Sequence, residues 1–204
     1  MDALRDAETE LARGRRLAAV RGLLANGSAT ALARLADLPP DGPGGTVLAE
    51  RLRFGPPETW MAWRRDWGRV ALKLAPPGTV ADARAAFRHP GVAPLLGWGG
   101  GWTAHAWIDG STLATALRLG PAPPGTLAAI AEAIAVLHAA GLAHGDLTPS
   151  NIVLSMAGPV LIDWGEDSAG TPGWRPDGNG AAPADRDLFA LDRLRELLAA
   201  SHRR

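Results

Sequence analysis

The segment that most constrains this chain is residues 144–164, which read HGDLTPSNIVLSMAGPVLIDW. Asp146 stands just before a Thr-Pro turn, Asn151 lies five positions after it, and Asp163 ends the second of two short apolar runs. In phosphoryl transfer the protein must position the nucleophile and hold metal ions against phosphate charge. Asp146 suits the first task, and Asn151 and Asp163 offer the hard oxygen ligands that the second requires. We therefore interpret this segment as a phosphoryl-transfer site.

The same residues resemble two motifs of the protein-kinase superfamily. HGDLTPSN is similar to the catalytic loop H-R-D-L-x-x-x-N, and IDWG is similar to D-F-G with Trp in place of Phe. The resemblance implies that Asp146 accepts or orients the proton of the acceptor hydroxyl, and that Asn151 and Asp163 hold Mg²⁺. His144 would brace the loop by packing and hydrogen bonding. Taken singly, Asp146 and Asn151 also fit an Asx-type turn, and His144 a structural histidine; the joint pattern makes these the minority interpretations.

Composition fits one compact domain or a small two-lobed one. The chain has 204 residues, of which 47% are hydrophobic, and 21 basic residues balance 21 acidic ones. A neutral chain gives no reason to expect a nucleic-acid or membrane footprint. The lack of Cys excludes thiolate chemistry and fits a reducing compartment. We expect a cytoplasmic protein, with a secreted effector as the alternative.

The N-terminal part predicts helices. Apolar residues at near-helical spacing predict a helix over residues 2–25, stopped by Asn26-Gly27, and a second short helix from Ser28 to Leu38. Residues 39–45, PPDGPGG, read as a linker because Pro and Gly interrupt regular structure. We predict that residues 1–45 form an N-terminal helical extension with its linker.

Three strand patterns follow, VLAERLRF, TWMAWRR and RVALKLA, and they predict the beginning of an antiparallel sheet. VALK resembles the V-A-I-K strand of kinases, and this resemblance implies that Lys73 binds the α- and β-phosphates of the nucleotide. The plainer alternative is a lysine that reaches solvent at a sheet edge. By the resemblance, residues 46–108 form the N-lobe and hinge.

Two parts of the kinase pattern differ in this chain. The glycine-rich phosphate loop is replaced by GPPET, residues 55–59, whose prolines offer no N–H to phosphate. The Glu that normally pairs with the strand lysine is also missing, since the only Glu between Lys73 and Asp163 is Glu132 in a later helix. Asp82 is the nearest acidic candidate, although it also fits the early-turn acid of a short helix.

Residues 95–113 read as two strands joined by a glycine hairpin and followed by a hinge. The resemblance places His105 near the gatekeeper position and the backbone of Ala106 to Ile108 at the adenine edge, so that Ala106 and Ile108 are candidate ATP-binding residues. His105 is not expected to bind metal, because no other ligand stands beside it at suitable spacing.

The remaining residues, 109–204, are predicted to form a truncated C-lobe. Residues 127–140 predict an amphipathic helix that Gly141 ends, and the runs 152–154 and 160–162 predict a two-strand ribbon. Asp187 is expected to begin the C-terminal helix as its N-cap. By the resemblance it also binds backbone amides of the catalytic loop.

Residues 163–177 are similar to a short activation segment. GTPGW-x-P-D, from Gly170 to Asp177, resembles G-T-P-x-Y-x-A-P-E, and Gly145 replaces the Arg that would receive a loop phosphate. The resemblance therefore implies an activity that does not depend on activation-loop phosphorylation.

Together these features predict an α+β, two-lobed minimal protein-kinase-like fold, with a small antiparallel-sheet N-lobe, a truncated helical C-lobe and an N-terminal helical extension. The resemblance is to atypical serine/threonine kinases such as RIO-type, KEOPS-type and small bacterial effector kinases, and it implies ATP and Mg²⁺ as cofactors. Expected partners are a protein substrate and a partner protein at the N-terminal helices. The alternatives are a sugar or aminoglycoside-like small-molecule phosphotransferase, and a pseudokinase or adaptor.

Overall fold

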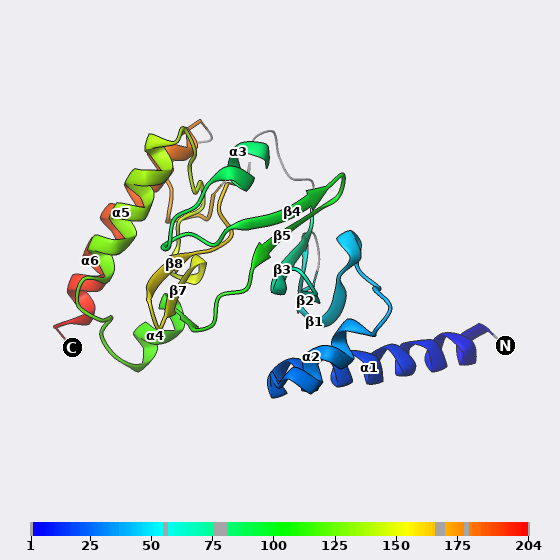
Figure 1. Ribbon diagram of the computed structural model, residues 1–204. Helices are drawn as coiled ribbons and strands as arrows, with labels where there is room; N and C mark the ends of the chain where they lie inside the picture. Colours follow the sequence, from blue (N-terminus) through cyan, green and yellow to red (C-terminus); the bar gives the residue numbers. More distant parts are fainter. Residues whose placement is uncertain (1, 55–56, 76–80, 166–169, 178–179, 204) are drawn as a thin grey trace. The chain divides into compact units, whose positions relative to one another are not determined.

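The computed structural model describes residues 2–54, 57–75, 81–165, 170–177 and 180–203 (Figure 1). The chain divides into two compact units. The first unit is Met1–Pro77 with Leu96–Trp107, and the second is Gly78–Leu95 with Ile108–Arg204. The division does not follow chain order, because residues 78–95 belong to the second unit although residues on both sides belong to the first.

The first unit contains an antiparallel sheet. Its strands are β1 (Val47–Arg53), β2 (Glu58–Arg64), β3 (Gly68–Leu74), β4 (Leu95–Gly99) and β5 (Trp102–Ala106), in the spatial order β1-β2-β3-β5-β4. The three strands predicted between residues 46 and 75 are therefore confirmed. Because β5 pairs with β3, strand β3 lies in the middle of the sheet and not at its edge.

Helices α1 (Asp2–Asn26) and α2 (Ala29–Ala36) pack against this sheet, so the predicted N-terminal helices are confirmed. Ser28 is the N-cap of α2, and its side chain accepts a hydrogen bond from Ala31 N–H. The apolar cluster that joins helices to strands consists of Val20, Leu24, Leu35, Val47, Ala49, Met61 and Trp63. The helices thus share a hydrophobic core with the sheet. A one-turn 3₁₀ helix, Pro43–Gly45, lies between α2 and β1.

The second unit is mostly helical. It contains α3 (Ala81–Ala86), α4 (Leu113–Leu119), α5 (Thr126–Ala139) and α6 (Pro183–Ser201), with a 3₁₀ turn at Pro149–Asn151. Strands β6 (Ser111–Thr112), β7 (Ile152–Ser155) and β8 (Gly158–Leu161) form a small antiparallel sheet in that order. The α5 helix and the β7–β8 ribbon were predicted, whereas α4 and β6 were not.

The hydrophobic core of the second unit holds the backbone of residues 144–164 in position. Ile130, Ile134 and Leu137 of α5 are buried against β7, β8 and α6. The other fully buried large side chains of this cluster are Leu113, Leu147, Ile152, Leu161, Trp164 and Leu194. Three of them, Leu147, Ile152 and Leu161, lie between the candidate site residues along the chain, so core packing fixes the backbone that carries those residues.

The prediction that Asp187 is a helix N-cap is wrong. Helix α6 begins at Pro183, with Ala182 as its N-cap. Proline suits the first helical position because its fixed φ is already helical and its missing N–H is not needed there. Asp187 therefore lies inside the helix, where its side chain is completely buried.

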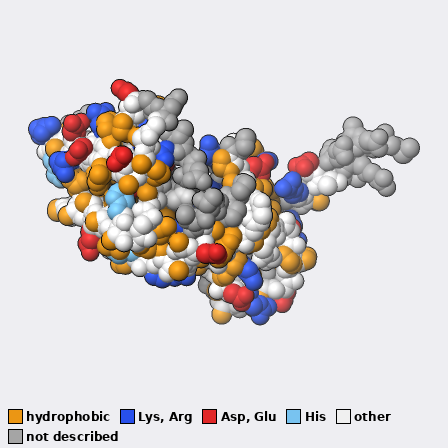
Figure 2. Space-filling view, turned by 90° about the horizontal axis from the view of Figure 1, so that it is seen from above, with side chains coloured by type: hydrophobic (Ala, Val, Ile, Leu, Met, Phe, Trp, Pro, Cys, Tyr) orange, Lys and Arg blue, Asp and Glu red, His pale blue; other side chains and the backbone are white. Residues whose placement is uncertain are grey.

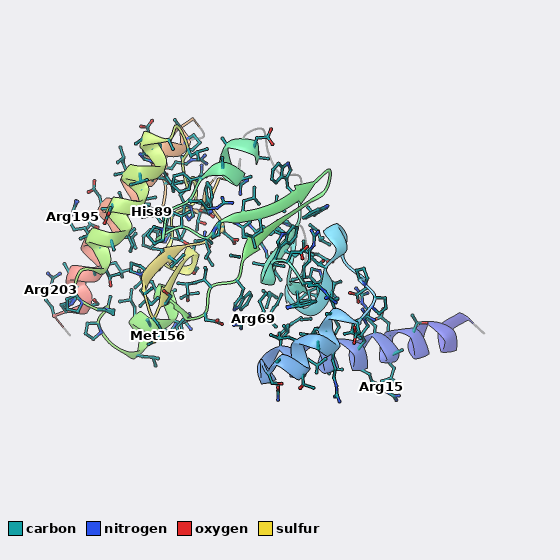
Figure 3. The ribbon with its side chains drawn as sticks, in the orientation of Figure 1. Arg15, Arg69, His89, Met156, Arg195 and Arg203 are labelled. Carbon is teal, nitrogen blue, oxygen red and sulfur yellow. The ribbon has the colours of Figure 1, made fainter. Side chains whose placement is uncertain are left out.

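Charged side chains on the surface are mixed in sign, and the face seen in Figure 2 has no extended area of one charge. In Figure 3, Arg195 and Arg203 project from the α6 end of the chain and Met156 from the β7–β8 turn. Met156 is fully exposed. Among the described residues, no helix combines the length and apolar character needed to cross a membrane.

Candidate active site

The loop that carries Asp146 leaves α5 through a tight turn. Gly141 has φ +70°, a left-handed conformation that glycine adopts without strain, and Leu142 N–H donates to Leu137 O at 3.0 Å. Leu142 and Leu147 are buried in the core on either side of the loop. Pro149 then starts the 3₁₀ turn that ends at Asn151. The loop is therefore held at both ends and in its middle.

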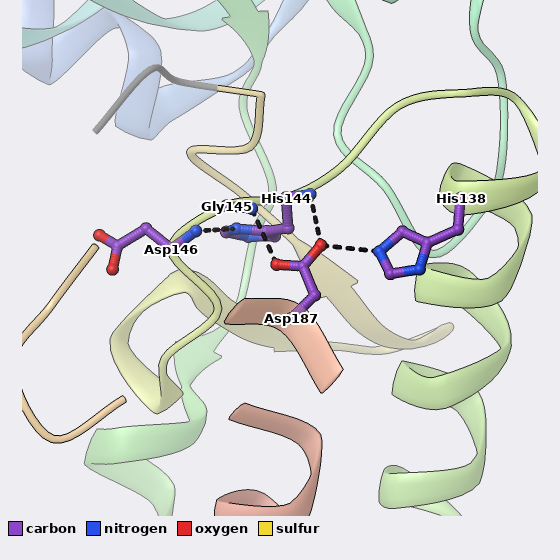
Figure 4. Close-up of polar contacts among 5 residues, drawn as sticks. All are labelled: His138, His144, Gly145, Asp146 and Asp187. Carbon is purple, nitrogen blue, oxygen red and sulfur yellow. Dashed lines mark hydrogen bonds and ion pairs between the residues drawn. The ribbon is translucent and has the colours of Figure 1, made fainter. Parts of the chain in front are cut away.

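Asp187 of α6 fixes the backbone of this loop (Figure 4). Its Oδ2 accepts from His144 N–H and its Oδ1 from Gly145 N–H, each at 2.8 Å. His138 Nε2 of α5 lies 3.0 Å from Oδ2. The contacts to the two amides agree with the role that the kinase resemblance implies for Asp187. A buried carboxylate needs such donors, since an unpaired one would be strongly destabilising.

His144 occupies the centre of the loop and is fully buried. Its Nδ1 accepts from Asp146 N–H at 3.3 Å. Burial lowers the pKa of His144 below its ordinary value of 6.5, and this outweighs the opposing effect of Asp187 and other nearby carboxylates. The ring is therefore neutral near pH 7, with the proton on Nε2 because Nδ1 is an acceptor. It acts as a brace for the loop, as predicted.

Asn151 and Asp163 lie beside each other at the end of the β7–β8 ribbon. Ile162 N–H donates to Asn151 O at 2.9 Å, directly before Asp163. The Asn151 amide nitrogen donates to Asp146 O at 2.8 Å, so its side-chain oxygen remains for another ligand. Asp163 has φ +59°, the only positive φ of a non-glycine residue among those described. Such backbone strain is concentrated at functional sites.

Asn151 and Asp163 carry the kind of oxygen donors that Mg²⁺ takes from proteins. Among the described residues, no group of three or more His, Cys, Asp or Glu side chains could hold a metal ion. Mg²⁺ commonly takes only one or two protein oxygens and completes its shell with water and substrate phosphates. The Asn151 amide oxygen and the Asp163 carboxylate match that donor set.

The Asp146 carboxylate is half-buried and has one oxygen engaged. Its Oδ1 accepts from Thr171 N–H at 2.7 Å. Thr171 belongs to the GTPGW segment, so this segment reaches the candidate base in the described structure. The second carboxylate oxygen remains for the proton of an acceptor hydroxyl.

Lys73 and Ala106 belong to the first unit, whereas Ile108, Asp146, Asn151 and Asp163 belong to the second. Lys73 is only 5% exposed, opposite Thr59 of β2 and Thr103 of β5. The alternative of a sheet-edge lysine is therefore wrong. Lysine is rarely buried this deeply without a partner.

The remaining sequence candidates lie in β5, in α3 and in the proline loop. Ala106 ends β5 opposite Val70, and His105 is buried opposite Ala71. Asp82 is exposed in the first turn of α3. In the proline loop, residues 55 and 56 lie outside the described residues.

Sequence reasoning missed two side chains that touch this site. His138 reaches Asp187 from α5, and Arg84 reaches the backbone of Trp164 from α3. His138 could have been found from its place six residues before His144, near the end of the helix that leads into the loop. Arg84 has no comparable signal, because 80 residues separate it from its contact.

The comparisons with known proteins support the same fold. No family model matches the sequence. Over 69 residues it is 44% identical to "Probable serine/threonine-protein kinase PkwA" of Thermomonospora curvata, a match that covers 31% of this chain and 9% of that protein. It is 29% identical over 127 residues to "EKC/KEOPS complex subunit bud32" of Aspergillus clavatus, covering 52% of this chain and 46% of that protein. The chain thus spans less than half the length of these relatives.

Solved structures agree over a larger part of the chain. The PknI kinase domain of Mycobacterium tuberculosis superimposes with a TM-score of 0.57 at 22% identity, over 72% of this chain and 71% of that one. A double mutant of the same domain gives a TM-score of 0.58 at 22% identity, over 76% of this chain and 74% of that one. With the antiparallel sheet, the helical second unit and the loop geometry, these likenesses identify the fold. The chain has a protein-kinase-like fold.

Proposed function

We propose that this protein is an ATP- and Mg²⁺-dependent protein kinase that phosphorylates Ser or Thr hydroxyls. The observation that carries the proposal is the arrangement in the second unit, where Asp187 holds the catalytic loop and Asn151 bonds to the backbone of Asp146 beside Asp163. The serine/threonine kinase names of the partial relatives support the same assignment.

Each residue has one role in this proposal. Asp146 accepts or orients the proton of the attacking hydroxyl, and Asn151 and Asp163 hold Mg²⁺, which neutralises charge on the phosphates. Lys73 binds the α- and β-phosphates, and the backbone from Ala106 to Ile108 receives the adenine. Because ATP is the proposed phosphate donor and Mg²⁺ the proposed metal cofactor, the cytoplasm is the proposed compartment.

A protein acceptor is favoured over a small molecule by the GTPGW segment. Its Thr171 N–H contacts the Asp146 carboxylate, so the segment borders the place where an acceptor hydroxyl must lie. In the kinase resemblance this segment supports the acceptor peptide. A pseudokinase is disfavoured because Lys73, Asp146, Asn151 and Asp163 are all present.

We further propose that activity does not require phosphorylation of the activation segment. Gly145 stands where the phosphate-binding Arg would be, and its φ of +80° is a conformation that L-residues adopt rarely. The hydrogen bond from Thr171 N–H to Asp146 holds the GTPGW part of the segment against the catalytic loop without a phosphate, and residues 166–169 of the segment lie outside the described residues. Recombinant protein that is unphosphorylated by mass spectrometry should therefore be active, and inactivity that ends on phosphorylation would contradict this.

The test of the function is Asp146→Asn. The variant should bind ATP with an affinity close to that of the wild type and lose phosphate transfer to a generic protein acceptor, because only the proton acceptor is removed. Phosphoamino-acid analysis of the wild-type product should give phosphoserine or phosphothreonine. Transfer to a sugar or aminoglycoside, with none to protein, would support the small-molecule alternative.

The N-terminal helices are the proposed binding site for a partner protein. A cavity of about 310 Å³ lies between α1 and β1–β2 and is lined in part by Arg13, Arg21, Arg51, Phe54 and Trp60. Phe54 is 75% exposed, and the Arg51 guanidinium lies 4.3 Å from the centre of its ring. The lining residues Arg13, Arg21 and Arg51 pair with the carboxylates of Glu10, Glu50 and Glu58. Because such surface pairs contribute only about 0–1 kcal/mol each, the proposed occupant is an acidic segment whose carboxylates replace those of the three glutamates.

A fluorescent peptide rich in Asp and Glu, with one Phe, is a suitable probe of this site. Anisotropy should detect saturable binding that Arg51→Glu abolishes. The control is Arg15→Glu, the same change in charge on α1, since Arg15 is exposed and does not line the cavity. Equal binding by wild type and Arg51→Glu would contradict the proposal.

A further inference from the structure

Arg84 of α3 is buried against the turn that carries Asp163. Its side chain is only 2% exposed, and its Nη2 donates to Trp164 O at 2.6 Å. The guanidinium carbon also lies 5.2 Å from the centre of a Trp164 ring. Arg84 therefore contacts both the backbone and the side chain of the residue directly after Asp163.

The turn itself needs outside support. Asp163 and Gly165 both have positive φ, +59° and +74°. The two ends of the turn are held by the catalytic loop, since Ile162 N–H donates to Asn151 O at 2.9 Å and Gly165 N–H to His144 O at 3.0 Å. A non-glycine residue at positive φ is strained and persists only where its surroundings impose that conformation. The peptide between Trp164 and Gly165 is held on its carbonyl side by Arg84.

The rest of Trp164 is held by the segment that follows α3. Trp164 Nε1–H donates to Ala93 O at 2.6 Å, and Phe87 packs edge-on against the ring with 5.6 Å between centroids. Trp164 is completely buried. Three groups from residues 84–93 therefore contact the turn: the Arg84 side chain, the Phe87 ring and the Ala93 carbonyl.

The space beside Gly165 is fitted to the Arg84 side chain. A Cβ at this position would lie 2.6 Å from Arg84 Nε and 2.9 Å from its Cδ. A buried arginine also costs desolvation, and an apolar side chain of similar size often stabilises such a site better. An apolar side chain at position 84 could not donate the hydrogen bond to Trp164 O that Arg84 donates.

We propose that Arg84 is a positioning residue for Asp163. It fixes the Trp164–Gly165 peptide and thereby the direction of the Asp163 carboxylate toward Mg²⁺. The inference rests on the proposed function, because it assigns Asp163 to the metal. Helix α3 would thus act on the metal site through an arginine.

The test compares Arg84→Met with Arg88→Met. Methionine fills most of the arginine's volume but cannot donate to Trp164 O. Arg88 is the matched control because it is exposed two residues after α3 and bonds only neighbouring carbonyls, Ala85 O and Phe87 O, among the described residues. Binding of a fluorescent ATP analogue is measured with and without Mg²⁺, together with thermal unfolding of each protein.

We expect Arg84→Met to raise the Mg²⁺ concentration for half-maximal nucleotide binding by about 10-fold, in the range typical of residues that orient metal ligands. Its metal-free nucleotide affinity should stay at the wild-type value, a split that general loss of structure would not produce. Arg88→Met should match the wild type in both. If Arg84→Met does not fold, Arg84→Lys, which keeps a donor, should show an intermediate Mg²⁺ requirement.

A folded Arg84→Met or Arg84→Lys with the wild-type Mg²⁺ requirement would overturn the inference while leaving the proposed function intact. Wild-type protein whose nucleotide binding does not depend on Mg²⁺ would instead overturn the proposed function, and the role of Arg84 with it. The two failures are therefore distinguishable in the same titration.

Discussion

Replacing Asp187 by Asn should destabilise the protein because of where its two oxygens lie. Oδ1 accepts from Gly145 N–H and Oδ2 from His144 N–H, and the carboxylate is completely buried. Asn offers one oxygen and one NH₂ group, so in either orientation one of the two amides faces a donor. His138 can adapt to either orientation by exchanging its tautomer.

The cost follows from these contacts. A buried amide that loses its acceptor costs about 1–3 kcal/mol, and the remaining bond loses the extra strength of a charged acceptor, about 1 kcal/mol. The sum is about 2–4 kcal/mol, which lowers the melting temperature of a chain of this size by about 5–15 °C. Phosphate transfer should fall as well, because the backbone on which Asp146 lies is released.

The assay is thermal unfolding followed by circular dichroism, with Asp192→Asn as the control. Asp192 is on the same helix and pairs with Arg195 on the surface, where its side chain is 70% exposed. Such a pair contributes about 0–1 kcal/mol, so the control should melt within a few degrees of the wild type. An Asp187→Asn variant that melts with the control would refute the reasoning.

Three further predictions follow from single contacts. Burial lowers the pKa of His144, so below pH 6.5 the unfolded chain binds more protons than the folded protein. The free energy of unfolding should therefore fall as the pH is lowered below 6.5, by up to about 1.4 kcal/mol per pH unit. Chemical denaturation between pH 5 and pH 8 would measure this slope, which a His144→Asn variant should lose. Gly110→Ala should lower the melting temperature, because its Cβ would lie 2.2 Å from Leu154 O at a φ of +149°. Trp164→Phe should cost about 1–3 kcal/mol in chemical denaturation, because the buried Ala93 carbonyl loses the indole donor, and no loss would contradict that account.

The local parts of the fold could be predicted from sequence because their signals are local. Periodic apolar residues, Ser28 before α2 and Gly141 after α5 mark element ends within a few residues of where they lie. The spacing from Asp146 to Asn151 and Asp163 also reflects contacts made within one short stretch of chain.

Contacts between distant segments could not be predicted in this way. The position of β3 in the middle of the sheet depends on its pairing with β5, about thirty residues later, and this pairing is what removes Lys73 from the sheet edge. Asp187 was expected at the start of a helix because an Asp before an apolar run is a frequent N-cap, yet Pro183 begins the helix earlier. Arg84 looks like an ordinary helix residue until Trp164 is placed beside it.

The most direct test of the proposed function is the transfer of the γ-phosphate of ATP in the presence of Mg²⁺ by the wild type and by Asp163→Ala. The wild type should label itself or a generic protein acceptor, and Asp163→Ala should not, because it lacks the carboxylate proposed to hold Mg²⁺. Labelling by both proteins to the same extent, or by neither despite tight nucleotide binding, would contradict the assignment of this site to protein phosphorylation.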